Sequence, residues 1–208
     1  GKRDNFRTQD PRPDDVPKSQ ARGAHRPFTE VAGGEMCMTG IANASVRWQI
    51  SGMNVLIDPN WSMWLIVIKR LKRPGLHIDN LPSIDTVLVT HAHFDHLDRR
   101  TLRRVAADQP IVVPTGVGNL VHDLGFNIVH ELDEWQDVQL GPLKVSLTPC
   151  HHWGARMLHD QHRGFGGFVI ESNARSIFHG GDSAYFPGFE EIGKRFPIEI
   201  ARLPIGPD

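Results

Sequence analysis

Apolar residues in this chain gather in short runs separated by turn-forming residues, a pattern that predicts strands. The clearest run is Thr86-Val87-Leu88-Val89, where β-branched and aliphatic side chains follow one another as in a strand buried on both faces. Ser51-Gly52 predicts a hairpin turn between two of the strands. The other predicted strands cover residues 41–50, 53–57, 111–113, 127–130, 143–148, 166–171, 175–179 and 198–203.

Helix signals lie between these runs. Asp98 can N-cap a helix from Arg99 to about residue 107. A second, short helix is predicted from Thr115 to about residue 124, and a third over residues 189–196. Because strands come in two groups with helices interspersed, the pattern favours a layered α/β sandwich over a simple doubly wound sheet.

Composition sets the domain limits. Residues 1–30 are rich in Pro, Arg, Asp and Gln and hold few large apolar side chains, so we predict an extended or disordered arm there. The remainder, 31–208, is predicted to form one domain whose ordered part begins near Met36. With 39% hydrophobic and 23% charged residues the chain is typical of a globular protein, and a net charge of −1 gives no electrostatic reason to expect nucleic acid. Cys37 and Cys150 lie too far apart in sequence to suggest a disulfide framework or a cysteine zinc site.

The segment 61–75 has an unusual composition, with two tryptophans and several aliphatic residues that run into four basic ones. We favour a loop or short helix packed on the core with a solvated basic end. Two other uses are peripheral membrane contact through residues 61–73 and a basic rim for anionic substrate head groups. No apolar run approaches the ~20 residues that span a bilayer. We therefore predict a cytoplasmic protein, with peripheral membrane attachment as the alternative.

The densest cluster of polar side chains, 90–98 (THAHFDHLD), directly follows the strand 86–89. In an extended segment, residues two apart project to the same side, so His91 and His93 can bind one ion together. Asp95 and His96 come where the chain turns and can reach a second ion. Imidazole and carboxylate at the carboxyl end of a strand are typical of a zinc site. The alternative is a surface histidine-rich loop that binds metal only incidentally.

Two later segments repeat this arrangement of a strand followed by metal-ligand residues. Residues 148–153 (TPCHHW) follow one predicted strand, and residues 180–183 (GGDS) follow another. Either would be a weak signal alone, because single histidines and Gly-Asp-Ser turns are common. Their repetition in one chain strengthens the prediction of a metal site.

The spacing His91-x-His93-x-Asp95-His96, followed by His152 and Asp182, resembles the metallo-β-lactamase superfamily. The segment 83–98, Thr148-Pro149 before the His-Trp pair, and the run 181–193 (GDSAYFPGFEEIG) are most similar to the branch of N-acyl-phosphatidylethanolamine phospholipase D and ascorbate-6-phosphate lactonase. The resemblance covers roughly residues 36–206. It implies a four-layer αββα sandwich.

The resemblance also implies a dinuclear zinc centre with a metal-bridging hydroxide. His91, His93 and His152 would hold one zinc, Asp95 and His96 the second, and Asp182 would bridge them. His152 matches the family position because Trp153 follows it. Asp95 is the residue expected to orient the hydroxide and handle its proton. Manganese, iron or nickel would also suit these ligands.

The resemblance assigns no single role to His151 and Tyr185. His151 is then an extra histidine, expected close behind the ligands. Tyr185, three residues after Asp182, is expected either near substrate, behind the ligands, or in the core.

The sequence departs from the family pattern in two places. Asn43 stands where the family has a histidine on an early strand, and Asn cannot titrate. The family's last ligand to the second zinc is a histidine well downstream of the bridging aspartate, and no histidine follows His179. We therefore expect the sandwich to be truncated at its C-terminus, with the remainder on a second chain, removed by cleavage, or encoded downstream of this sequence. A cut sheet would also favour homo-oligomers.

Three functions remain open from the sequence. The first is a dinuclear zinc phosphodiesterase, similar to phospholipase D, acting on a phospholipid-like or other small phosphodiester. The second is a zinc lactonase or amide hydrolase on the same fold. The third is a non-catalytic metal-binding protein with an incomplete second site.

Overall fold

The computed structural model describes residues 35–42, 44–65, 68–69, 74, 76–156, 162–172 and 175–204. The predicted arm at 1–30, with the domain start at 31, lies outside the described residues. So do Asn43 and most of the basic run that follows Trp64.

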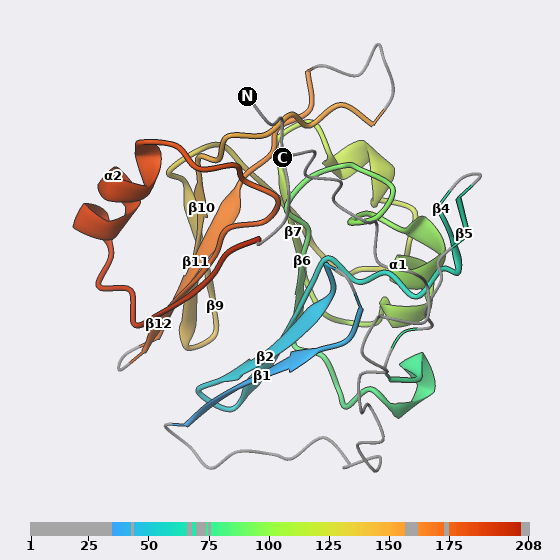
Figure 1. The fold of residues 1–208 in the computed structure, drawn as a ribbon. Helices are drawn as coiled ribbons and strands as arrows, with labels where there is room; N and C mark the ends of the chain where they lie inside the picture. Colours follow the sequence, from blue (N-terminus) through green and yellow to red (C-terminus); the bar gives the residue numbers. More distant parts are fainter. Residues whose placement is uncertain are drawn as a thin grey trace, which may run out of the picture.

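Within the described residues, two β-sheets lie against each other (Figure 1). The six-stranded sheet consists, in spatial order, of β1 (Met36–Gly40), β2 (Val46–Ile50), β3 (Met53–Ile57), β6 (Thr86–Leu88), β7 (Ile111–Pro114) and β8 (Val129–Leu132). The five-stranded sheet consists of β13 (Ile200–Arg202), β12 (Ser176–His179), β11 (Gly167–Glu171), β10 (Leu143–Thr148) and β9 (Asp137–Leu140). A separate hairpin is formed by β4 (Trp64–Leu65) and β5 (Ile68–Lys69).

Strand direction decides where the polar loops meet. In the first sheet β3, β6, β7 and β8 run parallel, so the loops that follow β3 and β6 leave the same edge. In the second sheet β10 and β12 are both antiparallel to β11 and therefore run the same way. The loops that follow these two strands are joined by a backbone bridge between His151 and Ala184.

Three apolar clusters separate the layers. The largest lies between the two sheets and takes every second residue of β3, Val55 and Ile57, together with residues of β10 and β11. Leu56, between them, faces the other way and packs in the cluster under α1 (Arg99–Val105). A smaller cluster joins the outer face of the second sheet to α2 (Gly188–Arg195). The predicted four-layer αββα sandwich is confirmed.

Most predicted strands are present, with four corrections. The strand predicted at 41–50 begins only at Val46, because residues 41 and 42 turn back to hydrogen-bond the Ser45 carbonyl; residues 36–40 form the separate strand β1. β9 was missed because only two of its four residues, Val138 and Leu140, are apolar. The helix predicted at 115–124 is only a 3-10 turn, Gly118–Leu120. The segment 61–75, predicted as a loop or short helix, holds the β4–β5 hairpin.

The predicted N-cap of α1 is confirmed. The Asp98 carboxylate accepts hydrogen bonds from the backbone N–H groups of Arg100 and Thr101, and from the hydroxyl groups of Ser62 and Thr101. These bonds satisfy helix N–H groups that have no partner within the helix. The cap therefore fixes where the ligand-bearing turn ends and the helix begins. None of the helices in the described part of the chain is long and apolar enough to cross a bilayer.

Candidate metal centre

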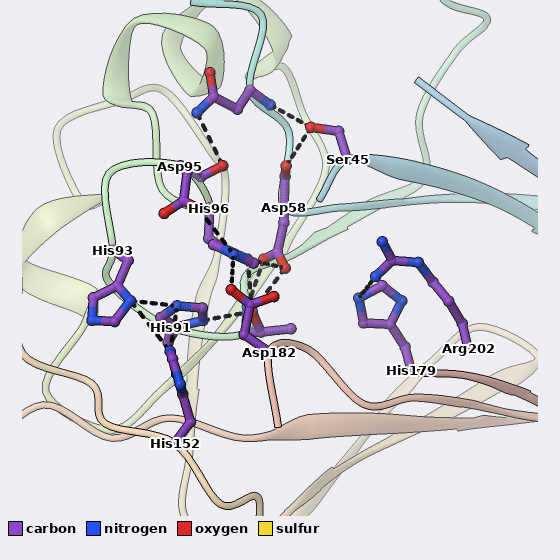
Figure 2. Close-up of polar contacts among 12 residues, drawn as sticks. Ser45, Asp58, His91, His93, Asp95, His96, His152, His179, Asp182 and Arg202 are labelled. Atoms are coloured by element: carbon purple, nitrogen blue, oxygen red, sulfur yellow. Dashed lines mark hydrogen bonds and ion pairs between the residues drawn. The ribbon is translucent and has the colours of Figure 1, made fainter. Parts of the chain in front are cut away.

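Three histidine nitrogens converge at the edge where the two sheets meet (Figure 2). His91 Nε2 lies 2.9 Å from His93 Nδ1, and His152 Nε2 lies 3.1 and 3.2 Å from these two atoms. Each ring nitrogen is either a donor or an acceptor, so in a triangle of this size at least two lone pairs or two N–H groups face one another unless a cation lies among them. Nitrogens around a tetrahedral zinc, with Zn–N of about 2.0–2.1 Å, lie roughly 3.3 Å apart. The triangle therefore fits a metal ion.

A second group of ligand atoms lies beside the first. His91, His96 and Asp182 place a nitrogen or carboxylate oxygen within 4.8 Å of one another. His96 Nε2 is 2.8 Å from Asp182 Oδ2, and Asp95 Oδ2 lies 3.7 Å from the same nitrogen. The structure thus brings together all six residues that the sequence predicted as ligands. Their individual roles as ligands stay predictions.

The turn that carries Asp182 requires glycine. Gly181 has a φ of +60°, a conformation that favours glycine, and an added Cβ would lie 3.3 Å from the Gly166 carbonyl and from Thr90. Gly166 in turn donates its N–H to the Thr90 carbonyl. The two sheets therefore touch through backbone at this point, which holds Asp182 against His96.

Asp58 is the functional residue that sequence reasoning missed. It follows β3, is fully buried, and accepts hydrogen bonds from the backbone N–H of Thr90 at 2.7 Å and from the Thr90 hydroxyl at 2.7 Å. The third donor is His96 Nδ1, at 2.8 Å. In the sequence, Asp58 directly follows the predicted strand 53–57. An acidic residue directly after a strand is the same signal that identified the other ligand segments.

These bonds assign the protonated nitrogen of two histidines. The Thr90 hydroxyl gives its proton to Asp58, so it accepts from His91 Nδ1, which lies 2.9 Å away. His96 donates from Nδ1 to Asp58 in the same way. Both rings therefore turn Nε2 toward the metal-binding groups. Such outer hydrogen bonds fix ring orientation and make the ligand nitrogen more basic.

Asn60 supports the ligand turn from the same strand end. Its side-chain amide donates to the carbonyl groups of Phe94 and Asp95, at 3.1 and 3.0 Å, and the residue is fully buried. The Ser45 hydroxyl accepts from the Asn60 backbone N–H and donates to the Asp58 carbonyl. The loop after β3 is therefore a rigid base under the turn at 93–96.

The histidines of the site differ in the direction in which their pKa values are shifted. Burial, reinforced by the neighbouring His96 ring, holds the pKa of His91 well below its usual value; burial also lowers the pKa of His93 and His152. For His96, burial opposes protonation, but Asp58 and Asp182 outweigh it and raise its pKa to about 10. Burial would raise the pKa of Asp182, yet the hydrogen bond and charge of His96 lower it. Three neutral rings thus stand ready to bind a cation, whereas His96 must release a proton to do so.

The remaining predicted residues in the described part of the chain, His151 and Tyr185, are exposed. His151 is exposed, with its backbone N–H bonded to the Ser183 hydroxyl and its ring 6.4 Å from that of Phe186. Tyr185 is 87% exposed, so the alternative that it packs in the core is wrong. Trp153 is also exposed, and its ring lies 4.9 Å from the His93 ring. An exposed aromatic ring, that of Trp153, therefore borders the three histidines.

The chain is similar to a known protein family and to several curated proteins. A family model described as "Beta-lactamase superfamily domain" matches residues 53–207. An uncharacterized protein of Mycobacterium tuberculosis is 29% identical over 181 residues, 82% of this chain and 49% of that protein. A UPF0173 metal-dependent hydrolase of Exiguobacterium is 32% identical over 177 residues, 82% of this chain and 74% of the relative. N-acyl-phosphatidylethanolamine-hydrolyzing phospholipase D 1 of Caenorhabditis elegans is 27% identical over 188 residues, 81% of this chain and 53% of the enzyme. The chain spans about half the length of the mycobacterial and nematode relatives.

Solved structures agree in fold. Igni18, a metallo hydrolase from Ignicoccus hospitalis, matches with a TM-score of 0.65 at 22% identity, over 82% of this chain and 71% of that protein. CmlA, a diiron β-hydroxylase from Streptomyces venezuelae, matches with a TM-score of 0.62 at 25% identity, over 80% of this chain and 34% of that protein.

The Asp58 network predicts that Asp58→Asn weakens metal binding. Asn tolerates the left-handed backbone of this position, where φ is +48°, so the change removes mainly the charge. We expect zinc affinity to fall about 10- to 100-fold, as for other outer-shell substitutions. Competition with a chromophoric chelator measures it. The matched control is Asp123→Asn, an exposed carboxylate that pairs with Arg99 on α1; equal affinities for both variants would contradict the role given to Asp58.

His179 gives a pH prediction for the metal-free protein. Its ring is fully buried, Arg202 Nη1 lies 3.2 Å from its Nε2, and burial lowers its pKa to about 3. Between this value and the ordinary 6.5, the unfolded chain binds a proton at this residue and the folded chain does not, so stability is lost as pH falls. In chelator-treated protein at pH 4–6, we expect His179→Gln to flatten the slope of unfolding free energy by about 1.4 kcal/mol per pH unit. His96 adds no slope there, because its proton is bound in both states.

Urea titrations at several pH values measure this slope, with the exposed His122→Gln as control. A His179→Gln slope equal to that of the control would show that His179 is not buried as a neutral ring.

Proposed function

The chain belongs to the β-lactamase superfamily, and from that premise we propose that it is a dinuclear zinc hydrolase of phosphodiesters. The predicted family is confirmed by the match over residues 53–207. The predicted enzyme class, a metal-dependent hydrolase, is confirmed at the level of the family by the names of its relatives. The metal, the number of ions and the substrate are our proposal.

The observation that carries the proposal is the triangle of nitrogens from His91, His93 and His152. Its edges of 2.9–3.2 Å have no satisfactory arrangement of protons, yet two strand ends and the Asp58 network are built to maintain it. His93 Nε2 is buried and has no partner of normal hydrogen-bond geometry among the described residues, although the backbone of Ala155 lies close enough to raise the pKa of this ring. A structural histidine cluster would instead pair each nitrogen with an acceptor or donor.

Two zinc ions in these groups would supply Lewis acidity toward a phosphoryl oxygen and lower the pKa of nearby water towards ~7. The protein's own residues do the rest. The Thr90 hydroxyl holds His91, and Asp58 holds His96, so that Nε2 of each ring faces the other ligand atoms. Asp95, about one-third exposed and 3.7 Å from His96 Nε2, is placed to take a proton from a water between the groups. Asp182 keeps its negative charge because His96 lowers its pKa.

The phosphodiester is favoured over a lactone by two lines of support. The run 181–193 is similar to the phospholipase side of the family, and the nematode relative is named for hydrolysis of an N-acyl phospholipid. Trp153, 60% exposed and against the His93 ring, and Tyr185, 87% exposed and three residues after Asp182, suit the apolar part of a phospholipid-like substrate. Trp64 is 55% exposed on the β4–β5 hairpin, and an exposed tryptophan suits the membrane interface. We therefore include peripheral membrane contact through residues 61–73 in the proposal. A lactonase or amide hydrolase, and a non-catalytic metal protein, are the competing functions.

The test is hydrolysis by the metal-stripped chain after reloading with zinc, manganese, iron or nickel in turn. We expect zinc-dependent turnover of bis(p-nitrophenyl) phosphate, and a loss of more than about 100-fold in His93→Ala and His152→Ala, because each removes one nitrogen of the triangle. His122→Ala, an exposed histidine outside the site, is the control. Turnover of a lactone panel without phosphodiester turnover would overturn the substrate class. Zinc near one per chain without any hydrolysis would favour the non-catalytic protein. Highest activity with iron would contradict the proposal that zinc is the metal, and would favour iron, the metal named for the structural neighbour CmlA.

A further inference from the structure

Arg156 contacts the turn that carries His93, Asp95 and His96. Its Nη1 donates to the carbonyl groups of Ala92, at 2.7 Å, and Leu97, at 2.9 Å. These two carbonyls belong to the residues that flank His93 and His96. One guanidinium nitrogen therefore joins both ends of the turn that carries three predicted ligands.

The same guanidinium group covers the middle of the turn. Its Cζ lies 3.9 Å from the centre of the Phe94 ring, a cation–π geometry. Within the turn, the N–H groups of His96 and Leu97 both donate to the His93 carbonyl, at 3.1 and 2.8 Å. Arg156 therefore adds bonds between the two ends of a turn that already has hydrogen bonds within it. These added bonds oppose separation of the two ends.

Arg156 is also tied to the third histidine of the triangle. It lies four residues after His152, and the chain between them has little freedom. An added Cβ at Gly154 would lie 2.6 Å from the Arg163 carbonyl, and the Trp153 ring packs edge-on against the His93 ring at 4.9 Å. A movement of Arg156 relative to the turn would therefore change the separation of His152 from His91 and His93.

We propose that Arg156 is a positioning residue that couples the His152 segment to the ligand turn and thereby sets the affinity of the first metal-binding group. The proposal rests on the metal centre described under the proposed function. Arginine suits the place because one planar group can donate to two carbonyls and present a flat face to a ring. A lysine ammonium could reach the carbonyls but could not stack in the same way.

The experiment compares Arg156→Gln and Arg156→Lys with wild-type chain. We expect Arg156→Gln to weaken zinc binding about 10- to 100-fold in competition with a chromophoric chelator, with the lysine variant in between. The control is Arg99→Gln, since Arg99 also donates to a backbone carbonyl, that of Leu120, but lies outside the site. Equal affinities in Arg156→Gln and wild type, or an equal loss in both glutamine variants, would overturn the proposal.

A second readout needs no metal. Hydrogen exchange of the metal-free chain, followed by mass spectrometry on the peptide that holds residues 91–98, reports opening of the turn. We expect faster exchange in Arg156→Gln than in Arg99→Gln, and equal exchange would overturn the proposal that Arg156 holds the turn. If the wild-type chain binds no zinc but Arg156→Gln still exchanges faster, the proposed metal centre fails, whereas the contact of Arg156 with the turn keeps its structural role. If Arg156→Gln does not fold, Arg156→Lys carries both tests.

Discussion

The buried carboxylate of Asp58 is the interaction on which the site depends. A carboxylate withdrawn from water costs several kcal/mol unless donors surround it. Here the donors are the N–H and hydroxyl of Thr90 and the ring of His96, all at 2.7–2.8 Å. The cost of burial is thus offset only when β3, the end of β6 and the ligand turn are all in place. Asp58 also adopts a left-handed φ of +48°, a strain that folded proteins retain mainly at functional sites.

The hydrogen bonds that stabilise the buried carboxylate in the folded chain also fix the orientation of the ligand histidines. The ring of His96 can satisfy Asp58 only by donating from Nδ1, and His91 can satisfy the Thr90 hydroxyl only in the same way. Since Nδ1 is occupied in both rings, each offers one nitrogen, Nε2, to a cation. His91 belongs to both ligand groups but can serve one ion only. A second ion would then rest on His96 and Asp182, with Asp95 as the nearest further oxygen donor.

The sequence predicted the ligands better than their support, for a physical reason. Histidines and aspartates at strand ends are local signals, so the segments 91–96, 148–153 and 180–183 could be identified one at a time. Asp58 and Thr90 are 32 residues apart, and Arg156 lies 64 residues from the Ala92 carbonyl that it binds. Such contacts follow from sheet order, which periodicity does not specify. The strand 143–148 was found because apolar and polar residues alternate over its six positions. β9 was missed because it holds only two apolar residues, and the boundary at 46–50 was set by a turn at Ser45.

The central claim is that two ions occupy the two groups of ligand atoms. Anomalous diffraction at the zinc absorption edge, from crystals of the zinc-loaded chain, tests it directly. The account predicts two peaks about 3.5–4 Å apart, one within the triangle of His91, His93 and His152 and the other beside His96 and Asp182. A zinc peak bound elsewhere, with the three histidine nitrogens still facing one another and no peak among them, would contradict the account.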